Sequence, residues 1–259
     1  MTHLLRKFLA QRLKVRLAYR FDFAVNALGD VLLAGVGLVF LDTLFLHVQG
    51  LGAYSPSEVL FCWGFAECVV GLFFVIFQGL WVLNQRYIVG GELDRVLLRP
   101  VDPYVHVLLD NVSLEDLPIA LLGGAVMIVA APGLGAVPAW HWVMLPVLLL
   151  GGACVLGGLL TIVSSAGFHL HHRGTAVGLV FQLSTFARYP IDLFSSPVRL
   201  LLTWALPLGF AGFYPASFLM DRPEWHVYAL AQPLVGLAAL ALGYGAFRFG
   251  LVRYASTGS

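Results

Sequence analysis

Long apolar stretches, separated by short polar segments, dominate the order of residues along the chain. Most of them reach the ~20 residues with which an α-helix crosses the hydrocarbon core of a bilayer. The pattern predicts an all-α integral membrane protein with about six transmembrane helices and little room for a soluble domain. The predicted spans lie at about 23–47, 58–82, 117–132, 142–166, 174–189 and 227–250.

The first twenty residues have a different pattern. Leu5, Leu9, Leu13 and Leu17 repeat at every fourth position, and six Lys and Arg residues fill much of the remainder. This pattern is typical of an amphipathic helix that lies in the membrane interface, with its cationic groups near anionic headgroups. We therefore expect an interfacial helix at 1–20, and a solvated tail is the alternative.

The segment 174–222 is apolar, but several prolines and charged residues interrupt it, and two arrangements fit it. In the first, which we prefer, a short span at 174–189 precedes a re-entrant, proline-broken region at 190–222 on the outer side. In the second, 174–196 lies on the inner interface and 199–219 crosses the membrane. Irregular backbone at membrane depth must be packed in protein or line a wet cavity, which favours a functional role for this segment.

Arg and Lys residues indicate the orientation. The N-terminal segment, the polar loop at 84–116, Arg173 and the C-terminus carry basic residues, whereas the turns at 48–57 and 133–141 carry none. Cytoplasmic loops are enriched in Lys and Arg, so we expect both termini in the cytoplasm.

Composition agrees with a membrane location. The chain is 59% hydrophobic and only 11% charged, whereas soluble domains are about 25% charged. The formal net charge of +1 gives no basic signal for nucleic acid. The three cysteines lie in apolar stretches without a CxxC or Cys/His spacing, so we expect no metal site.

No catalytic motif is visible. The two lysines, Lys7 and Lys14, do not follow a glycine-rich loop, so the chain has no phosphate-binding loop of its own. The cluster HLHHR at 169–173 is the one histidine-rich segment. It is typical of a basic helix end near headgroups, and a metal or haem site is the alternative. We expect no enzyme activity and no cofactor on this chain.

The polar loop contains a short amphipathic helix at 91–103. Leu93, Val96 and Leu97 are spaced to share one face, and charges of both signs cover the others. Helices that lie on a membrane surface favour basic charge alone, whereas mixed charge suits docking to a protein. A partner-docking helix is therefore the preferred interpretation, and a passive interfacial helix is the alternative.

Three segments resemble a known family. They are GELDRVLLRPVDPYVHVLL (91–109), YRFDFAVN (19–26) and RYPIDLFSSPVRLLLTWALPLGFAGFYPASFLM (188–220). Taken in their order along the chain, the three segments are similar to the bacterial six-span permeases of the type-two ABC exporter superfamily, which includes drug and polysaccharide exporters. The resemblance covers most of the chain and implies a single transmembrane permease domain at 1–259 in the bacterial inner membrane.

The resemblance also implies partners and sites. A second permease, identical or paralogous, would complete the translocation path, and two cytoplasmic ABC ATPase subunits would bind ATP and Mg²⁺. The cargo does not follow from the sequence. The residues of the implied ATPase-coupling helix are Glu92, Leu93, Asp94, Arg95, Leu97, Leu98, Arg99 and Pro100. Those of the implied outer gate are Arg188, Pro190, Asp192, Pro207 and Pro215.

Charged residues inside spans are costly and usually functional. Asp30 and Glu67 lie within predicted spans, where they line the translocation path or a permease interface, or else serve as structural pairs. Arg188 and Asp192 are four residues apart and are expected to form an ion pair around Pro190. The main rival function is an ion- or proton-coupled secondary transporter that uses Glu67 and Asp30; a membrane enzyme built on His169 and His172 is the third.

Overall fold

The computed structural model describes residues 20–170 and 175–254, and this part of the chain is almost entirely helical, without a β-strand. The predicted helix at 1–20 lies almost wholly outside the described residues. Within them, five helices are long and apolar enough to cross a membrane. The predicted all-α membrane class is thus confirmed.

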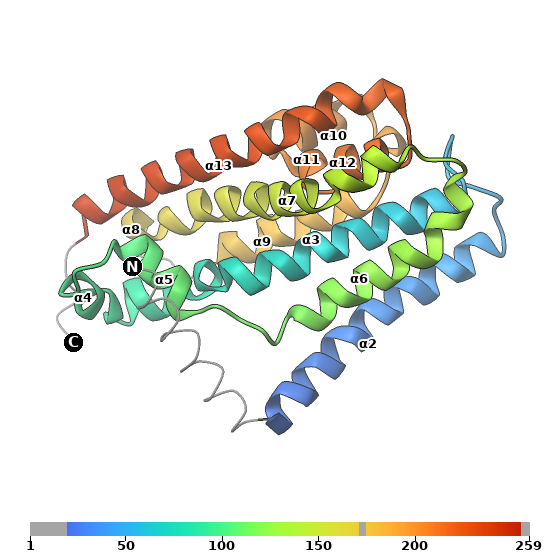
Figure 1. The fold of residues 1–259 in the computed structure, drawn as a ribbon. Coiled ribbons are helices and arrows are strands. Elements are labelled where there is room, and N and C mark those ends of the chain that lie inside the picture. The colour runs from blue at the N-terminus through green and yellow to red at the C-terminus, as the bar shows by residue number, and fades with distance from the viewer. Residues whose placement is uncertain (1–19, 171–174, 255–259) are drawn as a thin grey trace.

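The five long helices form a bundle in which α3, α7 and α13 run in one direction and α2 and α6 run in the other (Figure 1). Helix α3 packs against α6 and α7, and α13 packs along α7. Their bounds are α2 (Arg20–Phe45), α3 (Pro56–Val82), α6 (Leu117–Ala130), α7 (Ala139–Ser165) and α13 (His226–Val252). Most of α3 is buried inside the bundle, whereas α2 is largely exposed, as expected of a helix that faces lipid or a partner chain.

Glycines allow these helices to approach closely. A Cβ atom at Gly71 of α3 would collide with the backbone of Ala120 on α6. One at Gly158 of α7 would collide with the backbone of Ala239 on α13. Close approach through small residues is typical of helix association in membranes, where apolar burial alone does not drive helices together.

Helix α3 begins at a well-defined cap. The Ser55 hydroxyl accepts a hydrogen bond from the backbone N–H of Glu58, and the Glu58 carboxylate accepts one from the backbone N–H of Ser55. Pro56 occupies the first turn, where no intrahelical N–H bond is lost. The central helix therefore has a fixed starting point at one end of the bundle, which we call the outer end.

Short elements cover the other end, which we call the inner end (Figure 1). After α3 the chain continues through a π-helical turn, η1, and two short helices, and α8 follows α7 directly. Their bounds are η1 (Leu83–Val89), α4 (Glu92–Leu97), α5 (Pro103–Asp110) and α8 (Gly167–Leu170). Gly91, at φ 72°, precedes α4 in a left-handed conformation that glycine adopts without strain.

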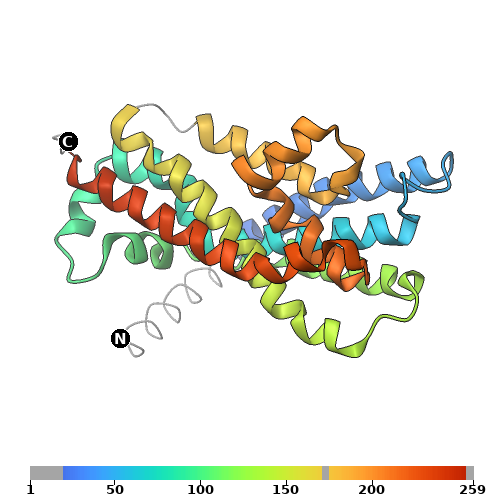
Figure 2. The same ribbon diagram turned by 90° about the horizontal axis from the view of Figure 1, so that it is seen from above.

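The chain from 175 to 225 is broken into short helices that gather toward the outer end (Figure 2). Helix α9 packs on α7, and the turn η3 that continues it packs on α3. The bounds are α9 (Thr175–Leu183), η3 (Ser184–Arg188), η4 (Ile191–Leu193), α10 (Ser196–Leu200), η5 (Leu201–Ala205), α11 (Leu208–Ala211), α12 (Phe213–Leu219) and η6 (Pro223–Trp225).

The second predicted arrangement of this segment is wrong, because 199–219 does not form one spanning helix. Leu206 is extended ahead of Pro207, as the residue before a proline tends to be. Gly212 then separates α11 from α12 with non-helical angles. The chain turns repeatedly here: α11 and α12 are buried, whereas α10 has no buried residue.

Candidate functional site

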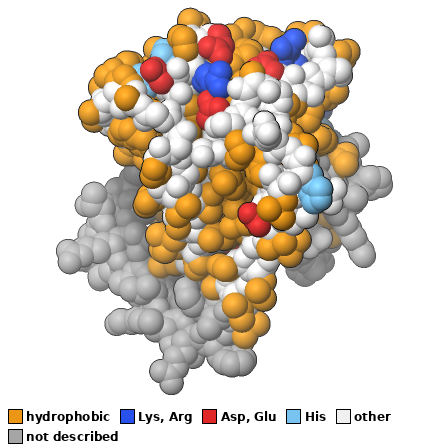
Figure 3. Space-filling view, turned by 90° about the vertical axis from the view of Figure 1, so that its right-hand side faces the viewer, with side chains coloured by type: hydrophobic (Ala, Val, Ile, Leu, Met, Phe, Trp, Pro, Cys, Tyr) orange, Lys and Arg blue, Asp and Glu red, His pale blue; other side chains and the backbone are white. Residues whose placement is uncertain are grey.

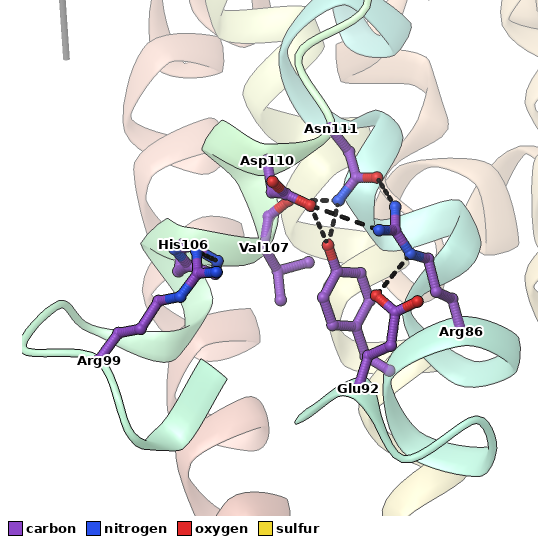
Figure 4. Close-up of polar contacts among 8 residues, drawn as sticks. Arg86, Glu92, Arg99, His106, Val107, Asp110 and Asn111 are labelled. Atoms are coloured by element: carbon purple, nitrogen blue, oxygen red, sulfur yellow. Dashed lines mark hydrogen bonds and ion pairs between the residues drawn. The ribbon is translucent and has the colours of Figure 1, made fainter. Parts of the chain in front are cut away.

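Arg86 is the centre of a polar network at the inner end (Figure 4). Its Nε donates a hydrogen bond to the Glu92 carboxylate at 2.7 Å, and its Nη1 donates one to Asn111 Oδ1 at 3.2 Å. Its Nη2 lies 3.7 Å from an Asp110 carboxylate oxygen. One guanidinium thus joins η1, the start of α4 and the end of α5.

Tyr87 and Asn111 complete this network. The Tyr87 hydroxyl donates to Asp110 at 2.9 Å and accepts from the Asn111 amide at 2.7 Å. The same amide also donates to the Val107 carbonyl at 2.8 Å. The Tyr87 side chain is buried. Short helices without such contacts are marginal, so this network is what fixes α4 and α5 on the end of α3.

Asp102 attaches α5 to the last long helix. Its carboxylate accepts hydrogen bonds from the backbone N–H groups of Tyr104 and Val105, which caps α5. The other carboxylate oxygen accepts a hydrogen bond from the Tyr244 hydroxyl of α13 at 2.8 Å and lies 3.5 Å from Arg248 Nη1. Asp102 therefore connects α5 directly to α13.

Helix α4 presents a mixed surface at this end. Leu93 and Val96 are buried against the rest of the chain, whereas Leu97 is 44% and Leu98 87% exposed. The predicted shared face of Leu93, Val96 and Leu97 is therefore wrong, because α4 ends at Leu97 and the chain turns outward there. We call the exposed set the α4 end surface; it consists of Arg95, Leu97, Leu98, Arg99 and Pro100.

The remaining residues of the predicted coupling helix lie beside this surface. Glu92 and Asp94 are half-buried in the first turn of α4, where acidic groups favour the helix dipole. Arg99, besides being exposed, donates a hydrogen bond from Nη1 to His106 Nε2 on α5 at 3.0 Å. The structure thus places the predicted segment at the inner end as α4 followed by a turn that contains Leu98, Arg99 and Pro100.

Glu67 forms an ion pair in the middle of α3. Its carboxylate lies 2.9 Å from Nη2 of Arg188, at the end of η3. Glu67 is 2% exposed, and Arg188 is partly exposed. Asp30, the other acidic residue predicted to be functional, lies on α2 and is partly exposed. The structure therefore assigns a definite partner to Glu67, on the proline-broken segment.

The predicted ion pair between Arg188 and Asp192 is wrong. Arg188 binds Glu67, and Asp192 instead accepts a hydrogen bond from Arg199 at 3.1 Å. The backbone explains the difference: Tyr189 and Pro190 are extended. Residues four apart meet only on a continuous helix, so the two side chains diverge.

The three prolines among the predicted gate residues lie between or within the short helices. Pro190 separates η3 from η4, and Pro207 precedes α11. Pro215 is buried within α12. All three lie among the short helices between 175 and 225.

Contacts of two residues, Asp192 and Arg222, connect this group to the start of α3, and sequence reasoning missed them. The Tyr54 hydroxyl donates to Asp192 at 2.9 Å. Arg222 lies 2.7 Å from the Glu58 carboxylate, donates to the Ala53 carbonyl, and lies over the Tyr54 ring at 5.0 Å. We call Tyr54, Glu58, Asp192 and Arg222 the outer staple. Burial, and then the hydrogen bond to Asp192, raise the pKa of Tyr54, so this phenol stays neutral.

Figure 3 views the outer end and shows charged side chains gathered at one edge of an otherwise hydrophobic surface. No sequence spacing signalled the outer staple, because its members come from the α2–α3 turn and from residues more than 130 positions later. Arg86, Tyr87, Asp110 and Asn111 were missed for a different reason. They lie in the predicted polar loop, but no motif distinguishes them there.

Long apolar helices, a proline-broken segment and a docked short helix at one end together define a multi-pass membrane protein. The sequence profile of the family described as ABC-2 family transporter protein matches residues 31–258. The chain therefore belongs to the ABC-2 transporter family, which confirms the predicted resemblance to type-two ABC permeases. No curated protein and no solved structure matches the chain.

Proposed function

We propose that this chain is the permease subunit of an ATP-driven exporter. It forms the translocation path with a second permease, identical or paralogous, and is driven by two separate cytoplasmic ATPase subunits that bind ATP and Mg²⁺. The chain itself is a transport component of the ABC-2 family. The observation that carries the coupling role is the exposed apolar pair Leu97 and Leu98, beside cationic Arg95 and Arg99, on a braced helix.

The physical argument rests on the exposure of this surface. An exposed leucine pair rimmed by charges is typical of a protein–protein contact with an apolar centre and a polar rim. Because the Arg86 network fixes α4 to α3, and Asp102 fixes α5 to α13, motion of a docked ATPase would reach two long helices. Rigid elements of this kind transmit domain motion.

In this scheme the inner end faces the cytoplasm. The segment 175–188 serves as a sixth, short membrane crossing, and 190–222 forms the re-entrant outer gate. Two observations support this arrangement. Helix α9 packs against α7 and η3 packs against α3, and the short helices that follow gather toward the outer end. Irregular backbone of this type is tolerated at membrane depth only where protein or water surrounds it.

The rival function, ion-coupled secondary transport through Glu67, receives less support. A coupling carboxylate must be free to exchange a proton or bind a cation, whereas Glu67 is paired with Arg188 at 2.9 Å. We therefore give Glu67 a structural or gating role in the exporter.

Co-purification tests the coupling role. The tagged chain is co-expressed with candidate ABC ATPases from neighbouring genes, and the wild type is compared with Leu98→Asp and with Leu46→Asp. Leu46 is an equally exposed leucine in the turn after α2, at the opposite end of the bundle. The expected result is that Leu98→Asp loses the ATPase or its permease-dependent hydrolysis, whereas Leu46→Asp retains both.

Equal binding and hydrolysis in all three proteins would contradict a docking role for α4. Because Leu98 is nearly fully exposed, Leu98→Asp is expected to fold, and the elution profile in size-exclusion chromatography verifies this.

A further inference from the structure

His141, Asp221 and His226 meet at the outer end, although they come from three separate segments. His141 lies in the first turn of α7, Asp221 follows α12, and His226 begins α13. One ligand atom from each residue lies within 4.8 Å of the other two. Asp221 Oδ1 is 3.9 Å from His141 Nδ1 and 3.9 Å from His226 Nε2.

These distances do not suit hydrogen bonds. A hydrogen bond between nitrogen and oxygen requires about 2.7–3.2 Å. His141 is 1% exposed, and its buried Nδ1 has no hydrogen-bond partner; the buried Nε2 of His226 has none either. Buried polar atoms are rarely left unpaired, because each costs about 1–3 kcal/mol. Two unpaired imidazole nitrogens that face one carboxylate therefore require an explanation.

A metal ion shared by the three residues would explain the two unpaired imidazole nitrogens. Metal–ligand bonds of about 2.0–2.1 Å in a tetrahedron place ligand atoms about 3.3 Å apart. The carboxylate of Asp221 is the exposed member of the group, at 47%, so its side chain can move to shorten both of its 3.9 Å distances. The ligand atoms of His141 and His226, which lie within 4.8 Å of each other, would also move closer on binding. Two imidazoles and one carboxylate with an open fourth position suit zinc and related divalent transition ions, and not Ca²⁺ or Mg²⁺, which take oxygen ligands.

The surroundings also suit a metal site. Trp140 and Phe218 pack against the His141 ring, with centroids 4.1 and 4.2 Å away, and Phe218 lies 5.0 Å from the His226 ring. An apolar shell of this kind orients ligands and limits access of water. Asp221 has φ 55°, a left-handed conformation that Asp tolerates better than most residues. It turns the chain between α12 and η6 so that the carboxylate comes to lie beside both histidines.

We propose that His141, Asp221 and His226 form a binding site for a zinc-class divalent cation at the outer end. The ion joins the start of α7 to the connection between α12 and α13, segments about 80 residues apart in the chain. Because the ion binds the folded arrangement, it stabilises the closed packing of these helices. This inference does not depend on the proposed export function.

Metal binding to the purified chain tests it directly. A protein with a streptavidin-binding tag, free of polyhistidine, is stripped with chelator and titrated with Co²⁺, whose visible absorption is intense in tetrahedral sites, and then with Zn²⁺. The titrations are made in a His171→Gln/His172→Gln background, which removes the second histidine cluster. The variants are His226→Gln and Asp221→Asn, and the control is His47→Gln, an exposed histidine at the same end.

We expect the protein to bind one equivalent of Co²⁺ with a tetrahedral absorption spectrum, and Zn²⁺ to displace the Co²⁺. Zn²⁺ should also raise the unfolding temperature of the protein. Affinity should fall by more than about tenfold in both ligand variants, since loss of an outer-shell partner alone costs about 10- to 100-fold, and should stay unchanged in His47→Gln. Asn tolerates the left-handed conformation of position 221 as Asp does, so Asp221→Asn is expected to fold. Absence of the spectrum in the wild type, or equal affinity in all variants, would overturn the proposal.

Discussion

The two ends of the bundle are held together in different ways. At the inner end, Arg86 bonds to residues only 6 and 25 positions away, and Tyr87 to one 23 positions away. At the outer end, Tyr54 bonds to a residue 138 positions away, and Arg222 to residues 164 and 169 positions away. The Arg86 network thus joins residues that are near one another in the chain, with Asp102 binding α5 to Tyr244 of α13, 142 positions away. The outer staple instead joins distant segments.

This difference indicates how the molecule would work as an exporter. The Arg86 network would hold α4 and α5 to the end of α3 through neighbouring residues, as a lever requires. A junction that depends on a few long-range contacts opens when those contacts break, as a gate requires. The four predictions below test this contrast, from the largest expected effect to the smallest.

Breaking the Glu67–Arg188 pair should have the largest effect on stability. Glu67→Leu leaves the guanidinium without its partner. Removing one member of a buried pair typically costs about 3–5 kcal/mol, and the partial exposure of Arg188 places the expected loss at the lower end of this range. The double variant Glu67→Leu/Arg188→Leu should recover most of that loss, since no charge remains unpaired. Thermal unfolding in detergent measures both variants. Equal loss in the single and double variants would contradict an ion-pair role.

Arg222→Leu should loosen the outer staple. It removes the pair with Glu58, the hydrogen bond to the Ala53 carbonyl and the contact over the Tyr54 ring, and we expect a loss of about 1–3 kcal/mol in the free energy of unfolding. Arg95→Leu, which removes an exposed arginine at the inner end, is the matched control and should change stability little. If Arg222→Leu left the free energy of unfolding unchanged, the long-range contacts of Arg222 would not be what stabilises the outer end.

Arg86→Met should have a local effect. Arg86 is 43% exposed, so the loss in global stability is expected to be about 1 kcal/mol or less. Hydrogen exchange should nevertheless rise across α4 and α5, because their polar brace is gone, and stay unchanged from 190 to 222. If hydrogen exchange rose equally in α4 and α5 and in residues 190–222, the Arg86 network would not be a local one.

Tyr54→Phe should give the smallest effect and a pH signature. Burial and Asp192 raise the pKa of Tyr54 in the folded state, so its contribution to stability is present below the unfolded value of about 10 and is lost as pH rises above it. Near neutral pH the variant loses one hydrogen bond, about 1 kcal/mol. Its unfolding free energy should fall less steeply above about pH 10 than that of the wild type, as measured in a pH series.

Hydropathy was sufficient to predict five long helices, because a bilayer requires uninterrupted apolar segments. The described part of the sixth predicted span, 174–189, instead forms the short elements α9 and η3. The α4 segment was also visible, through Gly91 before it and Pro100 after it. Its buried face was misassigned at Leu97, since a helix of six residues ends before the periodicity is complete. The pairing of Arg188 failed because the extended Tyr189 and Pro190 separate it from Asp192.

Long-range partners were beyond the reach of one sequence. Glu67 was recognised as a costly charge inside a span, but its partner is 121 positions further along the chain, and no spacing connects them. His141, Asp221 and His226 were missed for the same reason, since each is a single residue in its own segment. Only the folded arrangement brings such residues together.

Site-specific photo-crosslinking from α4 tests the central claim most directly. A benzophenone maleimide is attached through Leu98→Cys, in a background where Cys62, Cys68 and Cys154 are replaced, and the complex with the co-expressed ATPase is irradiated. The account predicts an adduct between this chain and the ATPase from position 98, and none from the matched Leu46→Cys probe at the outer end. An ATPase that co-purifies yet forms no adduct from position 98 would contradict it.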